Sequence, residues 1–150
     1  MFERIVVPTD GSEYAAAAAA DAIALAAVHG ATIHAVSVVD AGALGDLQLP
    51  GESARASDVL GEQAQTFVEE IEARAVAESV EVKTVVRSGP PGSEILDYAE
   101  EVDADLVVMG TRGHGGLHRL AVGSVTDHVI RFGDVRVLVV DAGADDERES

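Results

Sequence analysis

The chain has 150 residues, the length of one ordinary domain, and its residues are 47% hydrophobic but only 3% aromatic, so the core must be built from Ala, Val, Leu and Ile. Its 27 Asp and Glu stand against 10 Lys and Arg, and the resulting formal net charge of −17 excludes nucleic acid and anionic membranes as expected partners. The absence of cysteine excludes disulfides, zinc–thiolate sites and thiol nucleophiles.

Short apolar runs alternate with longer segments of helical character along the whole chain. In chain order, the expected elements are a strand over Arg4–Val7, a helix over Tyr14–His29, a strand over Thr32–Val39, a helix over Ala54–Glu78, a strand over Val82–Val86, a helix over Ser93–Glu101, a strand over Leu106–Met109, a helix over Ser124–Phe132 and a strand over Val135–Val140. Such alternation predicts an α/β fold, in which helices cover both faces of a parallel sheet.

Residues at the helix ends support these bounds. Asp10 is the expected cap of the first helix, with Glu13 three residues on, and Gly30 is its expected end. Ser93 is the expected cap of the third helix. The segment Ala41–Ser53 contains three glycines and a proline and is predicted to be a loop.

The chain is expected to form one domain over residues 1–141, followed by an acidic, disordered tail over residues 142–150. No apolar run reaches the length of a membrane span, and the N-terminus lacks a signal pattern, so a cytoplasmic location is expected. The acid-rich surface serves solubility, and it also fits a halophile-like cytoplasm in which salt screens the charge.

Two of the predicted strands are followed by polar, charged or glycine residues of the kind that bind ligands. Pro8-Thr9-Asp10 follows the first strand, and Gly110-Thr111-Arg112-Gly113 follows the fourth. Ligands bind to open parallel sheets at the carboxyl ends of the strands, where the strand order reverses. If the first and fourth strands are neighbours, a binding site lies between them.

The segment Gly110–Gly116 holds four glycines in seven residues directly after a buried strand. Glycine allows backbone N–H groups to turn toward an anion and allows a phosphate to come close. Gly123-Ser124-Val125-Thr126 then opens a helix, whose start offers N–H and hydroxyl donors. No Asp or Glu occurs from Leu106 to Thr126. A phosphate-binding segment over Gly110–Thr126 is therefore predicted, and a surface loop whose glycines serve only turns is the alternative.

Other phosphate motifs are absent. The sequence has no Gly-x-x-x-x-Gly-Lys-Ser/Thr loop, and its single lysine, Lys83, lies elsewhere. The Gly-x-Gly-x-x-Gly fingerprint does not follow the first strand. His114 and His118 lie four residues apart without a nearby carboxylate, so no metal site formed by the protein is expected.

The pattern Gly110-x2-Gly113-x9-Gly123-Ser124 matches the ATP-binding motif of universal stress proteins without a gap. Pro8-Thr9-Asp10-Gly11-Ser12 and Ser37-Val38-Val39-Asp40 also resemble segments of that family. The chain therefore resembles the single-domain, ATP-binding branch of the universal stress protein family over almost its whole length. The resemblance implies an open, Rossmann-like five-stranded parallel sheet in the order 3-2-1-4-5.

The resemblance also implies a set of nucleotide-binding residues: Pro8, Thr9, Asp10, Val38, Met109, Gly110, Arg112, Gly113, Gly123, Ser124, Val125 and Thr126. Asp10 would accept a hydrogen bond from the ribose or base, and Val38 would contact adenine through its backbone. The residues from Gly123 to Thr126 would hold the phosphates. The implied ligand is ATP or another adenine nucleotide, accompanied by Mg²⁺. Asp10 acting only as a helix cap, and Met109 acting only in the core, are the alternatives.

The resemblance implies a nucleotide-dependent stress-response or signalling module that acts through dimer or partner contacts. A slow ATPase or phosphotransferase is an alternative, but no dedicated base is identifiable, so no enzyme activity and no catalytic residue are expected. A nucleotide-free interaction module is the other alternative. The strand Val135–Val140 is expected to pair with its copy in a homodimer, although Arg136 stands where the family often has a proline.

Overall fold

The computed structural model describes residues 1–40, 52–112 and 122–141. Strands and helices alternate throughout these residues. In chain order they are β1 (Arg4–Pro8), α1 (Glu13–His29), β2 (Thr32–Val39), α3 (Glu52–Ala77), β3 (Val82–Ser88), α4 (Pro91–Glu101), β4 (Leu106–Gly110), α5 (Ser124–Phe132) and β5 (Val137–Val140).

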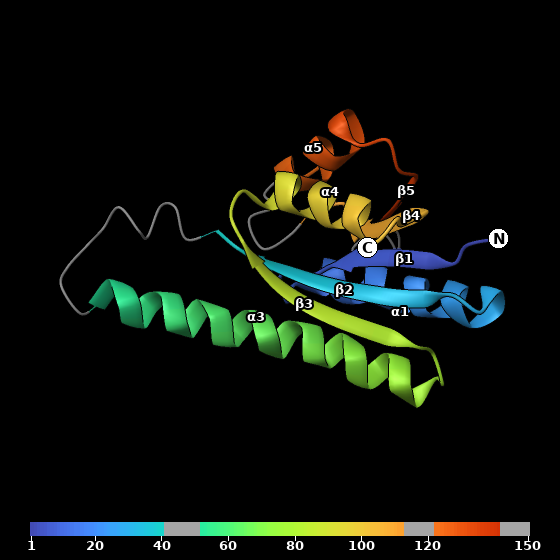
Figure 1. Ribbon diagram of the computed structural model, residues 1–150, viewed down its shortest axis with the longest axis horizontal. Coiled ribbons are helices and arrows are strands. Elements are labelled where there is room, and N and C mark those ends of the chain that lie inside the picture. The colour runs from blue at the N-terminus through green and yellow to red at the C-terminus, as the bar shows by residue number, and fades with distance from the viewer. Residues whose placement is uncertain (41–51, 113–121, 142–150) are drawn as a thin grey trace, which may run out of the picture.

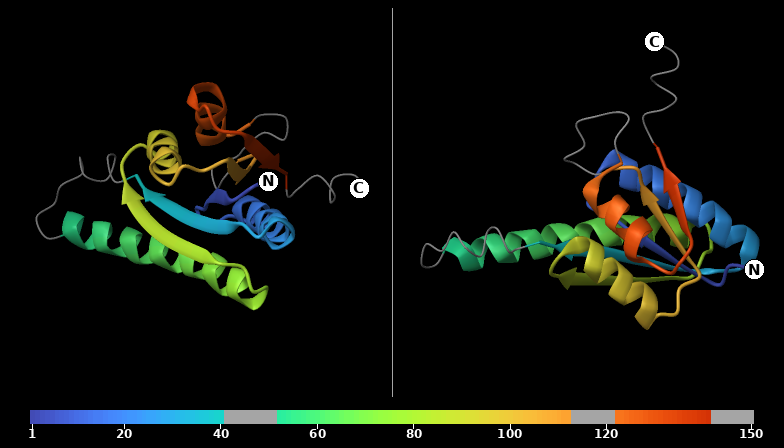
Figure 2. Two further views of the ribbon diagram at one scale, coloured as in Figure 1. Left: turned by 45° about the vertical axis from the view of Figure 1, so that its right-hand side comes forward. Right: turned by 90° about the horizontal axis from the view of Figure 1, so that it is seen from above.

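The five strands form one parallel sheet in the order β3-β2-β1-β4-β5, which confirms the predicted fold class (Figure 1). Helices α1 and α3 lie on one face of the sheet, and α4 and α5 lie on the other (Figure 2). β1 pairs with β2 on one side and with β4 on the other. The first and fourth strands are therefore neighbours, and the strand order reverses between them.

The core has two parts because successive residues of a strand face opposite sides of the sheet. Ile5 and Val7 of β1 pack under α1 and α3, whereas Val6 packs under α4 and α5. Where α1 faces the sheet, its buried side chains are mostly alanines, such as Ala18 and Ala22. These small side chains fill the core where the sequence supplies few aromatic residues.

The cap of α1 is Ser12, not Asp10. The Ser12 hydroxyl oxygen accepts a hydrogen bond from the Ala15 N–H at 3.1 Å, as an N-cap side chain does. Asp10 instead orders the preceding turn, because its Oδ1 accepts the Ser12 N–H at 3.0 Å. Gly30 ends the helix in the left-handed conformation with φ of 68°, as predicted.

Other predicted bounds also differ: β3 continues to Ser88, two residues beyond the predicted end at Val86, and α3 begins at Glu52, two residues before the predicted start at Ala54. α4 begins at Pro91, so Ser93 lies inside its first turn; proline fits the first helical position because no N–H is needed there. β5 begins at Val137 and not at Val135, because Val135 packs into the core beside α4 and α5 before the ladder with β4 begins. The predicted loop Ala41–Ser53 lies outside the described residues up to position 51, but its last two residues, Glu52 and Ser53, belong to α3. The tail at 142–150 lies outside the described residues entirely.

His34 is a buried titratable group on the α4 face of the sheet. Its side chain lies in β2 with 5% exposure, and its Nδ1 is 3.2 Å from the hydroxyl oxygen of Tyr98 in α4. Burial, followed by the positive charges of Lys83 and Arg4, lowers the pKa of His34 below 6.5, against a smaller opposing effect of Glu81. The neutral imidazole is therefore the form that fits the fold.

Acid should destabilise the protein through this histidine. The unfolded chain takes up a proton at His34 near pH 6.5, whereas the folded chain resists it until a lower pH, so stability falls as pH drops below about 6.5. The effect is bounded at about 1.4 kcal/mol per pH unit. Urea unfolding between about pH 7.5 and pH 5 should show a steeper loss in the wild type than in His34→Gln. Equal losses in the two proteins would contradict this role for His34.

Candidate functional site

A cavity of about 370 Å³ lies at the carboxyl ends of the central strands. Its walls come from β1, β2 and β4, from the starts of α1, α4 and α5, and from the turns beside them. The lining residues are Pro8, Thr9, Asp10, Ala15, Val36, Val38, Pro91, Ile95, Met109, Gly110, Arg112, Gly123, Ser124, Val125 and Thr126. The volume falls within the range of small-ligand sites.

The structure brings together every residue of the set implied by the resemblance except Gly113, which lies outside the described residues. Four lining residues were not in that set: Ala15, Val36, Pro91 and Ile95. Val36 lies two residues before Val38 in the same strand, so strand periodicity could have identified it. Pro91 and Ile95 come from α4, and no sequence motif connects that helix to the glycine segment.

The strand order places apolar, acidic and cationic residues at different positions across the cavity. Val36 and Val38 of β2 lie on one side, and Asp10 follows the central strand β1. Arg112 follows β4 on the other side. Across the sheet, the apolar region thus lies at β2, the carboxylate at the neighbouring β1 and the cation at β4. A ligand with an apolar ring at one end and negative charge at the other matches this arrangement.

The start of α5 supplies backbone donors to the cavity. Gly123 is the N-cap, and no side chain caps the helix. The first intrahelical hydrogen bond runs from the Asp127 N–H to the Gly123 carbonyl at 2.9 Å, so the N–H groups of Ser124, Val125 and Thr126 precede the helical ladder. All three residues line the cavity, and a helix start of this kind favours anions.

The Thr126 hydroxyl has a structural partner. It donates to the Gly110 carbonyl at 2.7 Å, and Thr126 is only 3% exposed. A hydroxyl has one proton to donate. Thr126 would therefore offer a ligand its backbone N–H, and its hydroxyl joins the start of α5 to the end of β4.

Gly123 lies close against the main chain that follows β4. A Cβ at this position would be 3.0 Å from the Cα of Arg112 and 3.4 Å from the Thr111 carbonyl oxygen. The Gly123 N–H also donates to that Thr111 oxygen at 2.6 Å. Glycine thus allows the start of α5 to approach the residues that carry Arg112.

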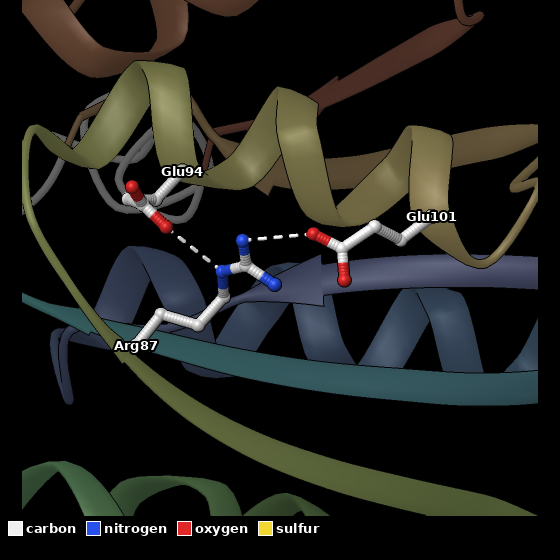
Figure 3. A network of polar contacts seen from close by, with 3 residues as sticks. All are labelled: Arg87, Glu94 and Glu101. Atoms are coloured by element: carbon white, nitrogen blue, oxygen red, sulfur yellow. Dashed lines mark hydrogen bonds and ion pairs between the residues drawn. The ribbon is translucent and has the colours of Figure 1, made fainter.

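Arg87 connects β3 to α4 beside the apolar end of the cavity. It is the register partner of Val38, and its guanidinium lies between Glu94 and Glu101 of α4, at N–O distances of 2.8 and 2.9 Å (Figure 3). Its Cζ also lies 5.7 Å from the ring centroid of Tyr98. Hydrogen bonds to Glu101 and Glu94 raise the pKa of Arg87. The network connects α4, which supplies Pro91 and Ile95 to the wall, to the edge of the sheet.

Acidic and histidine side chains form no metal centre in the part of the chain that the structure describes. In residues 1–40, 52–112 and 122–141, His, Asp and Glu side chains form no group of three that could hold a metal ion. Within the same described ranges, no helix combines the length and apolar character needed to cross a bilayer.

Most of the chain is similar to known proteins. The model of the universal stress protein family matches residues 1–141. The chain is 37% identical over 140 residues to the universal stress protein MJ0531 of Methanocaldococcus jannaschii, a match that covers 93% of this chain and 82% of the relative.

Solved structures agree with this match. The structure of the protein MJ0577 superposes with a TM-score of 0.84 at 28% identity, covering 94% of this chain and 96% of that one. A universal stress protein solved in complex with cAMP superposes with a TM-score of 0.67 at 25% identity, covering 94% and 98% of the two chains. The sequence match over residues 1–141 and the shared fold lead to one conclusion: the chain belongs to the universal stress protein family.

Proposed function

We propose that the chain binds an adenine nucleotide, with ATP as its principal ligand, and acts as a nucleotide-dependent stress-response or signalling module. The observation that carries this proposal is the cavity, which joins an apolar region to a helix start with N–H donors and a cation. A nucleotide has the complementary arrangement, because its base is a flat apolar ring and its phosphates are anionic.

The strand order suggests how the ligand lies. The base would rest near Val36 and Val38, the ribose near Asp10, and the phosphates at Arg112 and the start of α5. The relative that was solved with cAMP, which is itself an adenine nucleotide, supports this ligand class. Mg²⁺ would accompany the phosphates, as it commonly does in nucleotide sites.

We propose binding without efficient turnover. Hydrolysis needs a group that orients the attacking water near the terminal phosphate. Asp10 is a carboxylate of the cavity wall, but it follows β1, whereas the phosphate-binding donors follow β4 and begin α5. In this arrangement Asp10 belongs to the ribose side of the site.

Nucleotide binding should stabilise the protein. ATP at about a hundred times its Kd should add about 2.7 kcal/mol to the free energy of unfolding, which corresponds to a rise in Tm of roughly 5–11 °C. We expect AMP to give a smaller rise, because it offers fewer phosphates to Arg112 and α5, and GTP to give less than ATP. Protein purified without added nucleotide and then denatured should release an adenine nucleotide.

Several results would contradict the proposal. If no nucleotide is released and no adenine nucleotide raises Tm, this cavity is excluded as a nucleotide site. Equal stabilisation by GTP would exclude the adenine preference. Conversion of radiolabelled ATP to ADP at on the order of ten per second would show an efficient enzyme instead of a binding module.

We also propose that the module works as a homodimer through β5. Among the described residues β5 pairs with β4 alone, so its outer edge has no partner strand there, and Leu138 on this strand is 38% exposed. An uncovered apolar edge strand invites pairing with another chain. Light scattering of the ATP-bound and nucleotide-free preparations measures whether the chain forms this homodimer. The sequence predicts that the protein acts in the cytoplasm.

A further inference from the structure

Arg112 rests on an aromatic ring that lies outside the cavity lining. Its Cζ is 5.3 Å from the ring centroid of Tyr14, within the range of a cation–π contact. Arg112 is only 8% exposed and lines the cavity. Tyr14 is half-buried in the first turn of α1, and it is not among the lining residues. The ring therefore contacts the arginine without being part of the cavity wall itself.

Tight packing fixes Tyr14 at this place. A Cβ on Gly110 would lie 2.7 Å from the Tyr14 Cβ and 3.0 Å from its backbone carbonyl group, so the first turn of α1 touches the end of β4 directly. Arg112 follows two residues later, and its Cα is in turn close to Gly123, the N-cap of α5. The main chain of Arg112 is thus confined near α5, while its side chain lies on the ring from α1.

We propose that Tyr14 is a positioning residue for phosphate binding, because its ring holds the Arg112 guanidinium in the cavity wall. This role for Tyr14 rests on the proposed nucleotide function. An arginine side chain has many rotamers, and ordering it costs conformational entropy when a ligand binds. A ring that already holds the guanidinium removes part of that cost before the phosphates arrive.

The geometry of the contact suits this role. A cation–π contact is an attraction between the positive charge and the face of the ring, and it needs no N–H hydrogen bond from the guanidinium. The cation–π contact therefore does not consume the donors that a phosphate needs. It also keeps the positive charge on the β4 side of the cavity, beside the N–H groups that begin α5.

The effect of Tyr14 should depend on the phosphates. Tyr14→Leu keeps the Cβ and backbone that pack against Gly110 but removes the ring, so it should weaken ATP binding by about fivefold, the effect of losing roughly 1 kcal/mol of cation–π contact. Adenosine binding should be unchanged, because adenosine carries no phosphate. Tyr14→Phe keeps the ring face and should bind ATP as the wild type does. Calorimetric titration with ATP and with adenosine measures both affinities.

A double-mutant cycle tests whether the ring acts through Arg112. Arg112→Gln should weaken ATP binding, and adding Tyr14→Leu to it should cause no further loss. The Tm of each protein without nucleotide should show that the Tyr14 variants are folded. If Tyr14→Leu weakens adenosine and ATP equally, or if Tyr14→Phe is as weak as Tyr14→Leu, the positioning role is overturned.

ATP and adenosine binding by the wild type shows whether a failed test concerns the role of Tyr14 or the nucleotide site itself. If the wild type binds neither ATP nor adenosine, the proposed nucleotide site is wrong and the role of Tyr14 falls with it. If the wild type binds ATP and Tyr14→Leu binds it equally well, the nucleotide site stands and only the role of Tyr14 is overturned.

Discussion

Gly110→Ala is expected to lower the free energy of unfolding by about 1–3 kcal/mol and Tm by roughly 3–10 °C. The added Cβ would lie 2.7 Å from the Tyr14 Cβ and 3.0 Å from the Tyr14 backbone, and a helix backbone cannot move away as the tip of a flexible side chain can. The strain would separate the end of β4 from α1 and displace the wall that carries Arg112. Thermal and urea unfolding measure the loss, and the ATP-dependent Tm rise should shrink with it.

Gly61→Ala is the matched control for this substitution. Gly61 lies within α3, and a Cβ there would meet no atom within 4 Å. Alanine should therefore raise stability by about 0.5–1 kcal/mol, because it favours the helix more than glycine does. If Gly110→Ala is as well tolerated as Gly61→Ala, the close contact between β4 and α1 does not hold in solution.

Thr126→Val is expected to lower the free energy of unfolding by about 1–3 kcal/mol, although valine has nearly the same shape as threonine. The variant removes the hydroxyl that donates to the Gly110 carbonyl at 2.7 Å in a buried place. That carbonyl oxygen would lose a partner away from water, and the start of α5 would lose its link to β4. Urea unfolding measures the stability, and titration with ATP measures the effect on the site.

Thr126→Ser is the conservative variant, because it keeps the hydroxyl and removes one methyl group. It should retain most of the stability and bind ATP nearly as the wild type does. If the Val and Ser substitutions are equally harmful, the methyl packing of Thr126 matters as much as its hydrogen bond to Gly110, which would contradict this prediction.

Secondary structure was largely predictable because the local signals are strong. An alanine-rich run followed by Gly30 specifies α1, and β-branched runs specify β2 and β4. The errors lie at element ends, where competing groups decide. Ser and Asp are both favoured N-cap residues, so the sequence alone does not decide between Ser12 and Asp10. In the folded chain the Ser12 side chain accepts the Ala15 N–H, and Ser12 is therefore the cap of α1.

The residues of the cavity were also predictable only where they lie close together in the sequence. The spacing of Gly110, Gly123 and Ser124 is enough to identify the β4–α5 side of the cavity, because these residues form one short motif in the sequence. The wall from α4 could not be identified this way, because Pro91 and Ile95 reach the cavity only when α4 packs on the sheet. The contact between Tyr14 and Arg112 likewise joins residues 98 positions apart in the chain.

The sequence by itself determined the alternation of strands and helices, the glycine spacing and the acid-free segment, because each depends on residues near one another in the chain. Tertiary structure decided which strands are neighbours, which helix starts meet at the cavity, and that the Thr126 hydroxyl is committed to Gly110. These depend on distances between segments that only packing brings together. The hydrogen bonds and close contacts that shape the α5 end of the cavity therefore become visible only in the folded chain.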